Sequence, residues 1–491
     1  MSPPVFAVVG RVNKGKSSII ATLAEDATVE ISPRPGTTRR LTRFPVKVDD
    51  ATQFELVDTP GFEDASRALH WLRAETITAD ARPARVRALV EAFAGTGDLS
   101  DECTLLEPIL AGAFVIYVVD GSQPFRANYE DEMEILRWTG RPGMALINRI
   151  ADDDHAPAWR PALQQYFSVV RDFDAHAATF AQRIGLLRAF RELDAGLAPA
   201  LDRAVEALVA QRRRRRADVA DAMTDLLVDA ITLTLEARAA GKDALATVEL
   251  ERRFHEALRD TERRARAKVA TLYKHPGQWA DDDVGRPVFD ADLFAEQVWE
   301  GLGLSSGQLL VALTLSGAVA GGTLDAMVGG ASWGTGAAIG AAVGAVSGGV
   351  HAARRMARAT RLRDALRGKG GGKLYRVGPH QNPNFPFVLL DRALLHYDAV
   401  LRRTHARRDL ATVATPERRA GGHEPSAQGT SERGASAALD RATRAALVSA
   451  FAKVRKNFED PPRQARDAIH AQVRALVEAT DHAAGGEIGR G

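Results

Sequence analysis

The chain has 491 residues, so two or more domains are expected. Its formal net charge is only +2, which excludes a strong positive potential over the whole protein that would attract nucleic acid. Cys103 is the only cysteine, which excludes an internal disulfide and is typical of a reducing cytosol. The N-terminus enters an apolar run within a few residues, which leaves no room for a signal peptide and predicts a cytoplasmic protein.

The first informative stretch is a glycine-rich loop between a predicted strand and a predicted helix. Residues 5–9 are an apolar run of buried-strand type, residues 10–17 read GRVNKGKS, and a helix is expected from 17 to 24. Such a loop wraps phosphates with backbone N–H groups at a helix N-terminus, while its lysine reaches the β/γ-phosphates and its serine binds Mg²⁺. The expected nucleotide-binding residues are Gly10, Asn13, Lys14, Gly15, Lys16, Ser17 and Ser18, with Lys16 catalytic and Ser17 a metal ligand.

Two further pieces follow in the order that a nucleotide switch requires. Residues 35–40 form a breaker-rich loop that carries a threonine pair, and a strand over 52–57 ends in the sequence DTPG. A loop threonine can coordinate Mg²⁺ only when a γ-phosphate is present, and Asp58 can hold the same ion through water. The N–H of Gly61 can sense the γ-phosphate, which predicts a catalytic role for Gly61.

Together, Gly10-x-x-Asn13-x-Gly15-Lys16-Ser17, Gly36-Thr37-Thr38 and Asp58-Thr59-Pro60-Gly61 resemble the Era-like branch of the TRAFAC GTPases, which includes ribosome-assembly and tRNA-modification GTPases. The resemblance covers about the first 190 residues. It implies GTP and GDP as ligands, Mg²⁺ as cofactor, and Thr38 as metal ligand and catalytic residue. Some relatives hold a monovalent cation with the residue at the position of Asn13. K⁺ dependence is therefore one expectation, and a hydrogen bond within the loop is the alternative.

Guanine selectivity is where the sequence departs from this family. Strands are predicted over 113–120 and 142–147, and the second runs into Asn148-Arg149-Ile150-Ala151-Asp152, where the family carries Asn-Lys-x-Asp. Ala151 replaces the aspartate that accepts from guanine, so either Asp152 or a following aspartate (153 or 154) substitutes, or discrimination is poor. Ala175 is the remaining match to the loop that backs the base.

Hydrolysis also needs a group that the motifs do not supply. Phe62 stands where Ras-like switches carry a water-orienting Gln, so slow turnover is expected, with help from Glu63, Arg39, Arg40, a cation at Asn13 or a partner. Residues 63–110 are longer than a minimal connection. They predict three helices, over 65–75, 82–94 and 104–111, which either report nucleotide state to a partner or decorate the surface.

The rest of the chain is predicted to be mainly helical. Residues 199–273 are almost uninterrupted helix formers, with a basic run at 211–216 that is either a lipid or RNA contact or a solvated helix face. Residues 301–350 are two charge-free halves separated by Asp325, with glycine at every fourth position from 336 to 348 and a basic flank. This pattern favours contact with the inner face of the cell membrane, and a buried hairpin and reversible insertion are the alternatives.

The predicted fold class is therefore an α/β P-loop domain with a mostly parallel sheet, followed by a mainly α-helical region. The expected divisions are 1–195 for the GTPase domain, 196–411 for a helical domain, 412–437 for a flexible linker, and 438–491 for a last helix and tail. The loop over 375–387 and the helix over 388–403 resemble a region of uncharacterised function found behind such GTPase domains in proteobacteria.

Three functional alternatives to a GTP-hydrolysing switch follow from the same features. The degraded guanine motif allows an ATPase or unselective NTPase, and the missing glutamine allows a nucleotide-gated membrane or protein scaffold that scarcely hydrolyses. RNA or ribosome binding rests only on the family resemblance and the basic runs. A protein partner or a homodimer is left open.

Overall fold

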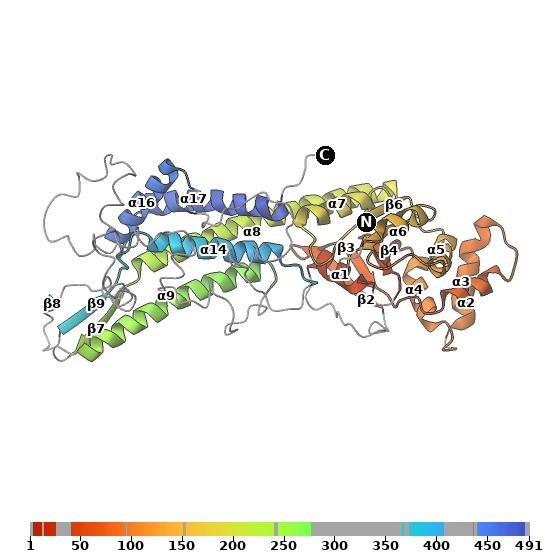
Figure 1. Ribbon diagram of the computed structural model, residues 1–491, viewed down its shortest axis with the longest axis horizontal. Coiled ribbons are helices and arrows are strands. Elements are labelled where there is room, and N and C mark those ends of the chain that lie inside the picture. The colour runs from red at the N-terminus through yellow and green to blue at the C-terminus, as the bar shows by residue number, and fades with distance from the viewer. Residues whose placement is uncertain are drawn as a thin grey trace, which may run out of the picture. The chain divides into compact units, whose positions relative to one another are not determined.

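The computed structural model describes residues 3–11, 14–25, 41–94, 96–150, 154–239, 244–275, 366–367, 373–406, 436 and 439–486. The chain divides into two compact units. The first comprises Met1–Arg215, Leu401–Asp409 and Asp481–Gly491, and the second comprises Arg216–Val400 and Leu410–Thr480. Figure 1 labels their elements along the chain. The sequence-based divisions at 195, 411 and 437 stay predictions.

A six-stranded sheet forms the centre of the first unit, in the order β2-β3-β1-β4-β5-β6. The strands are β1 (Val5–Val9), β2 (Thr42–Val48), β3 (Ala51–Asp58), β4 (Phe114–Asp120), β5 (Gly143–Asn148) and β6 (Val169–Asp172). All neighbours pair in parallel except β2, which pairs antiparallel with β3. The predicted mostly parallel α/β sheet is confirmed. Because the carboxyl ends of parallel strands meet at one edge, the loops after β1, β3, β4 and β5 are brought together there.

Alternate residues of each strand enter two separate cores, one on each face of the sheet. Phe6 and Val8 pack with α1 (Lys16–Ala24), α7 (Phe180–Phe190) and the first turns of α8 (Ala198–Thr232). Ala7 and Val9 pack into the other core, with α2 (Ala65–Arg73), α3 (Arg82–Phe93), α4 (Ser100–Leu110), α5 (Asn128–Trp138) and α6 (Ala156–Leu163). This period of two is the pattern of a strand buried on both faces. Short 3-10 helices lie at Ala79–Ala81 and Ala195–Leu197.

The three helices predicted for the insertion after the DTPG sequence are present as α2, α3 and α4, although α4 begins four residues before the expected start (Figure 1). Their apolar faces are buried, including Leu69, Val86, Leu89, Leu105 and Leu106, and belong to one core with the central strands. The insertion therefore forms part of the helical layer on one face of the sheet. Because that core is close-packed, a displacement of these helices would also shift the side chains that pack against them.

The second unit is predominantly helical, as predicted. It contains the end of α8, then α9 (Ala244–Leu272), α14 (Phe385–Arg402), α16 (Arg441–Lys456) and α17 (Arg463–Asp481), followed by a short helix at His482–Gly486 whose residues lie in the first unit. A small antiparallel sheet has the order β7-β9-β8, formed by β7 (Leu235–Ala239), β9 (Lys373–Val377) and β8 (Leu366–Arg367). Arg392 and Glu262 form a buried ion pair with a shortest contact of 2.7 Å between Nε and Oε1.

Several sequence-based elements need correction. Residues 42–48 form a strand that was not predicted, because Pro45 and alternating basic residues are tolerated only on an edge strand. Residues 235–239 break the predicted continuous helix, because they pair with β9. The predicted loop over 375–387 begins as β9, and the last helical piece is two helices separated by Pro461 and Pro462.

Among the described residues, no helix is both long enough and apolar enough to cross a membrane. The apolar segment 301–350 lies outside the described residues, as does nearly all of the predicted linker over 412–437.

Candidate nucleotide-binding site

The phosphate loop connects the end of β1 to the start of α1, as predicted. Gly15 is the N-cap of α1 with φ +83°, and Gly10 has φ +139°, both in the region that favours glycine. A Cβ at Gly10 would run into the carbonyl oxygen of Val118, and a Cβ at Gly15 would run into the Nδ2 of Asn148. Both glycines are therefore required by backbone conformation and by close packing, which is what a phosphate-binding turn demands.

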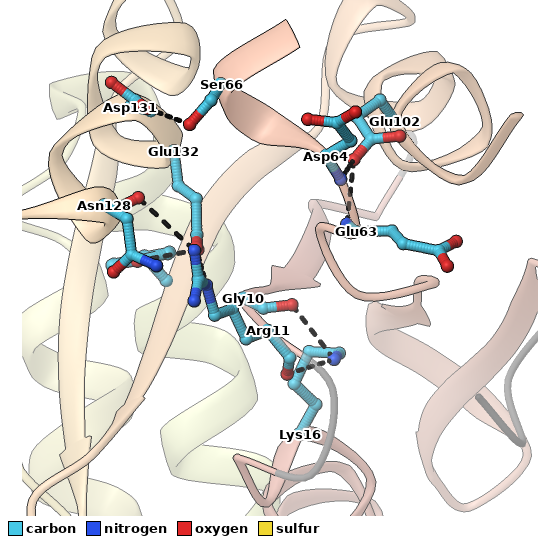
Figure 2. Close-up of polar contacts among 11 residues, drawn as sticks. Gly10, Arg11, Lys16, Glu63, Asp64, Ser66, Glu102, Asn128, Asp131 and Glu132 are labelled. Atoms are coloured by element: carbon cyan, nitrogen blue, oxygen red, sulfur yellow. Dashed lines mark hydrogen bonds and ion pairs between the residues drawn. The ribbon is translucent and has the colours of Figure 1, made fainter. Parts of the chain in front are cut away.

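Lys16 begins α1 and is almost fully buried, with 7% of its surface exposed. Its ammonium donates to the backbone carbonyls of Gly10 (3.1 Å) and Arg11 (2.9 Å), so the side chain folds over the loop (Figure 2). Burial lowers the pKa of Lys16 to about 8, and the charge of Asp58 opposes this shift. Among the described residues, the hydrogen bonds of this buried cation go to neutral carbonyls, so it is suited to gain from an anionic ligand. Ser18, in the same first turn, is also buried.

The predicted metal ligands of the first and third motifs lie in contact. The hydroxyl of Ser17 donates to Asp58 Oδ2 at 2.9 Å, and Asp58 is 4% exposed at the end of β3. Adjacent Thr59 donates to the carbonyl of Val8 at 2.8 Å, which ties this turn to β1. Hydroxyl and carboxylate oxygens are the donors that Mg²⁺ prefers, so the set fits the ion. Thr38, the third predicted ligand, lies outside the described residues, as does Asn13.

The sequence did not reveal a second anchor of the phosphate loop. The guanidinium of Arg11 forms an ion pair with Glu132 on α5 (Figure 2). Its central carbon also lies over the Tyr129 ring, 4.5 Å from the ring centre. Tyr117 on β4 donates to the other oxygen of Glu132 at 2.9 Å. Glu132 is fully buried, and burial raises its pKa to about 7 while Arg11 opposes the shift. No sequence signal links Arg11 to an acid 121 positions away.

The turn after the DTPG sequence is held from two sides. The Phe62 N–H donates to the carbonyl of Gly10 at 3.3 Å, and its ring is buried in the core beside α2. Phe62 is therefore a packing residue, consistent with the inference that it orients no water. The next two N–H groups, of Glu63 and Asp64, donate to the buried carboxylate of Glu102 on α4 (Figure 2).

On the base side, Asn148 connects the phosphate loop to the loop after β6. Its Nδ2 donates to the carbonyl of Lys14 and its Oδ1 accepts from the N–H of Ala175, both at 3.3 Å. The Thr22 hydroxyl donates to the carbonyl of Ala175 at 2.8 Å, and the Lys14 ammonium lies 3.4 Å from Asp120 Oδ2. The predicted residues 14, 148 and 175 are therefore brought together.

The guanine-reading position is the weakest part of the site. Ala151, Asp152 and Asp153 lie outside the described residues. Asp154, a predicted substitute, accepts from the N–H of Ala156 at 3.1 Å through one oxygen and pairs with Arg149 at 3.2 Å through the other. The first contact places Asp154 at the start of α6, and the second links it to Arg149, which directly follows β5.

Three arginines of the basic run at 211–216 form ion pairs within the first unit. Arg212 pairs with Asp481 at 2.7 Å, Arg214 with Asp49 at 2.7 Å, and Arg215 with Glu25 at 2.9 Å. Burial alone would raise the pKa of Glu25, but Arg183 and Arg215 hold it well below its usual range. These pairs weaken the reading of this run as a lipid or RNA contact.

Residues 160–477, more than half of the chain, match the model described as a domain of unknown function (DUF3482). The chain belongs to this family. Residues 5–148 match the model described as 50S ribosome-binding GTPase, and the N-terminal part of this DUF3482 protein is an Era-like P-loop GTPase domain, as the resemblance implied.

Individual relatives agree with that assignment. The GTPase Era of Acidimicrobium ferrooxidans is 38% identical over 106 residues, which are 20% of this chain and 35% of Era. The GTPase Der of Xanthomonas campestris pv. campestris is 28% identical over 194 residues, 40% of this chain and 35% of Der. The DUF3482 protein thus spans about a third of the length of the curated relatives it matches.

Among solved structures, Aquifex aeolicus Era matches with 14% identity and a TM-score of 0.25, over 56% of this chain and 100% of Era. The bacterial selenocysteine-specific elongation factor EF-Sec matches with 18% identity and a TM-score of 0.24, over 39% of this chain and 29% of that one.

Proposed function

We propose that the N-terminal unit binds GTP and hydrolyses it to GDP and phosphate, and that the bound nucleotide controls the helical region. The observation that carries this proposal is the contact between Ser17 and Asp58, at 2.9 Å. It joins the phosphate loop to the DTPG turn at the ends of the adjacent parallel strands β1 and β3. In a nucleotide switch these two motifs hold the same Mg²⁺ and phosphates.

Each predicted residue has a role in this proposal. Backbone N–H groups of residues 10–18 would surround the phosphates, and Lys16 would neutralise charge that develops on them. Ser17, Asp58 and Thr38 would hold Mg²⁺, which when bound supplies positive charge beside the phosphates. Gly61 would present its N–H to the γ-phosphate, and Asn148 with Ala175 would shape the base side.

Intrinsic hydrolysis should be slow, because Phe62 is committed to the core and orients no water. GTPases without help turn over on the order of 10⁻⁴–10⁻³ s⁻¹. A K⁺ ion held by Asn13 would be one source of help.

The test is to measure the full chain with guanine and adenine nucleotides. Calorimetry should show tighter binding of GDP than of ADP, and phosphate release at saturating GTP should be slow and Mg²⁺-dependent, with K⁺ compared against Na⁺. Tighter binding of ADP would make the protein an ATPase or unselective NTPase. Firm binding of GTP without phosphate release would make it a nucleotide-gated scaffold.

We further propose that residues 301–350 contact the inner face of the cell membrane. The support is in the sequence: two charge-free halves, glycine at every fourth position from 336 to 348, and a basic flank that begins at Arg354. Flotation of the full chain with anionic vesicles, beside a variant that lacks 301–350, tests this. The full chain should float and the deletion variant should not. If neither associates with vesicles, the membrane proposal is wrong.

A further inference from the structure

A buried carboxylate from the inserted helices holds the backbone that follows the DTPG turn. Glu102 lies in the first turn of α4, and its side chain is almost fully buried, with 1% of the residue exposed. A single oxygen, Oε1, accepts from the N–H of Glu63 at 2.8 Å and from the N–H of Asp64 at 2.7 Å. Both contacts are short, charge-assisted hydrogen bonds.

The location of these two N–H groups explains why the carboxylate is stable there. Asp64 is the N-cap of α2, and its own side chain accepts from the N–H of Arg67. The Glu102 carboxylate therefore lies at the positive end of a helix dipole and has two donors, which compensate its burial. The two N–H groups are successive in the chain, and they lie 39 and 38 positions before Glu102.

The clamped segment directly follows Gly61, whose N–H is proposed to sense the γ-phosphate. On its N-terminal side, Phe62 is fixed by its N–H to the carbonyl of Gly10 and by its buried ring. On its C-terminal side, Glu102 fixes residues 63 and 64. Glu63 lies between these anchors with its side chain exposed, and Figure 2 shows its carboxylate directed away from Glu102. The backbone clamp thus determines where the first polar side chain after Gly61 points.

The same clamp connects that segment to the insertion. Leu105 and Leu106 of α4 pack in one core with Phe62 and with α2 and α3. Because that core is close-packed, a displacement of the inserted helices would move the Glu102 carboxylate together with the backbone it holds.

We propose that Glu102 is a positioning residue for GTP hydrolysis: it holds the backbone of Glu63 and Asp64 in the geometry in which the group that orients the attacking water can act. This inference rests on the proposed GTPase activity. Glu102 acts through the two N–H groups that it holds, rather than as a ligand of the phosphates or the water. Its effect is on the rate of the chemical step, while nucleotide affinity depends on the phosphate loop.

The experiment measures kcat for GTP and the Kd for GDP of the full chain with Glu102→Ala, Glu102→Gln and Glu102→Asp. Gln keeps an oxygen acceptor at the same reach, whereas Asp keeps the charge but is one methylene shorter. We expect kcat to fall about 10- to 100-fold in Glu102→Ala and Glu102→Asp, because misplacement by about 1 Å has effects of that size. Glu102→Gln should retain kcat within about threefold, and the Kd for GDP should stay within about threefold in every variant.

The matched control is Glu107→Ala, an exposed acid on the same helix, which should leave both constants unchanged. If Glu102→Ala does not fold, the contrast between Gln and Asp decides. The inference is overturned if kcat is unchanged in Glu102→Asp, if Gln is as slow as Asp, or if kcat and GDP affinity fall together. A wild-type chain that releases no phosphate from GTP overturns the proposed function as well, so the two failures are distinguishable.

Discussion

The phosphate side and the base side of the site meet at Asn148. They differ in how many of the residues expected of a nucleotide-binding site each of them has. On the phosphate side, two glycines, Lys16 and the Ser17–Asp58 pair have the residue types, burial and contacts of a phosphate and metal site. On the base side, Asn148 and Ala175 hold loops together, but Ala151 replaces the guanine-reading aspartate. Phosphate binding depends on many backbone groups, whereas base selection depends on few side chains, and Ala151 removes one of them.

The largest expected effect comes from the phosphate side. Lys16→Ala should weaken GDP and ADP alike by at least about 100-fold, because it removes a buried cation that makes charge-assisted contacts with phosphate. Isothermal calorimetry of the full chain measures this. Lys47→Ala, which changes an exposed lysine on β2, is the control and should bind like wild type. Wild-type GDP affinity in Lys16→Ala would refute the assignment of the phosphate loop.

A smaller effect is expected from pH. In the nucleotide-free protein the pKa of Lys16 is lowered to about 8 by burial, so its ammonium is present below pH 8 and lost as pH rises through it. Phosphates bind the ammonium form. GDP affinity should therefore be about tenfold weaker at pH 9 than at pH 7, with uptake of a proton on binding at pH 9.

Calorimetry in buffers of different ionisation enthalpy measures both quantities. The ratio of GDP to ADP affinity should stay constant across this range, because the titrating group lies on the phosphate side. Affinity that is flat from pH 7 to pH 9 would show that Lys16 stays charged in the free protein. A ratio that changes with pH would show that the two sides are not independent.

The sequence predicted those parts of the fold whose signals are local. The continuous apolar runs at β1, β4 and β5 are typical of buried strands, and the glycine-rich loop after β1 indicated the edge of the sheet at which the site lies. β7 was missed because Leu235–Ala239 is composed of helix formers and is a strand only through its pairing with β9. Tertiary pairing there overrides local propensity.

The same distinction applies to the site. Lys16, Ser17 and Asp58 belong to motifs with fixed spacing, so their meeting was predictable. Glu102 and Glu132 were not found, because a buried acid has no sequence signature until its partners, 15 to 121 positions away, are known. Asn13, Thr38 and Asp152 stay predictions, since they lie outside the described residues.

The ion pair between Arg212 and Asp481 has a consequence for how the protein is divided into fragments. Asp481 is completely buried and accepts from the Arg212 guanidinium at two nitrogens, and residues 401–409 and 481–491 belong to the first unit. The GTPase unit is therefore assembled from three separated stretches of chain. A fragment that stops near residue 215 has the complete sheet and phosphate loop but lacks the carboxylate that neutralises Arg212, and so leaves that guanidinium without the ion pair it has in the intact protein.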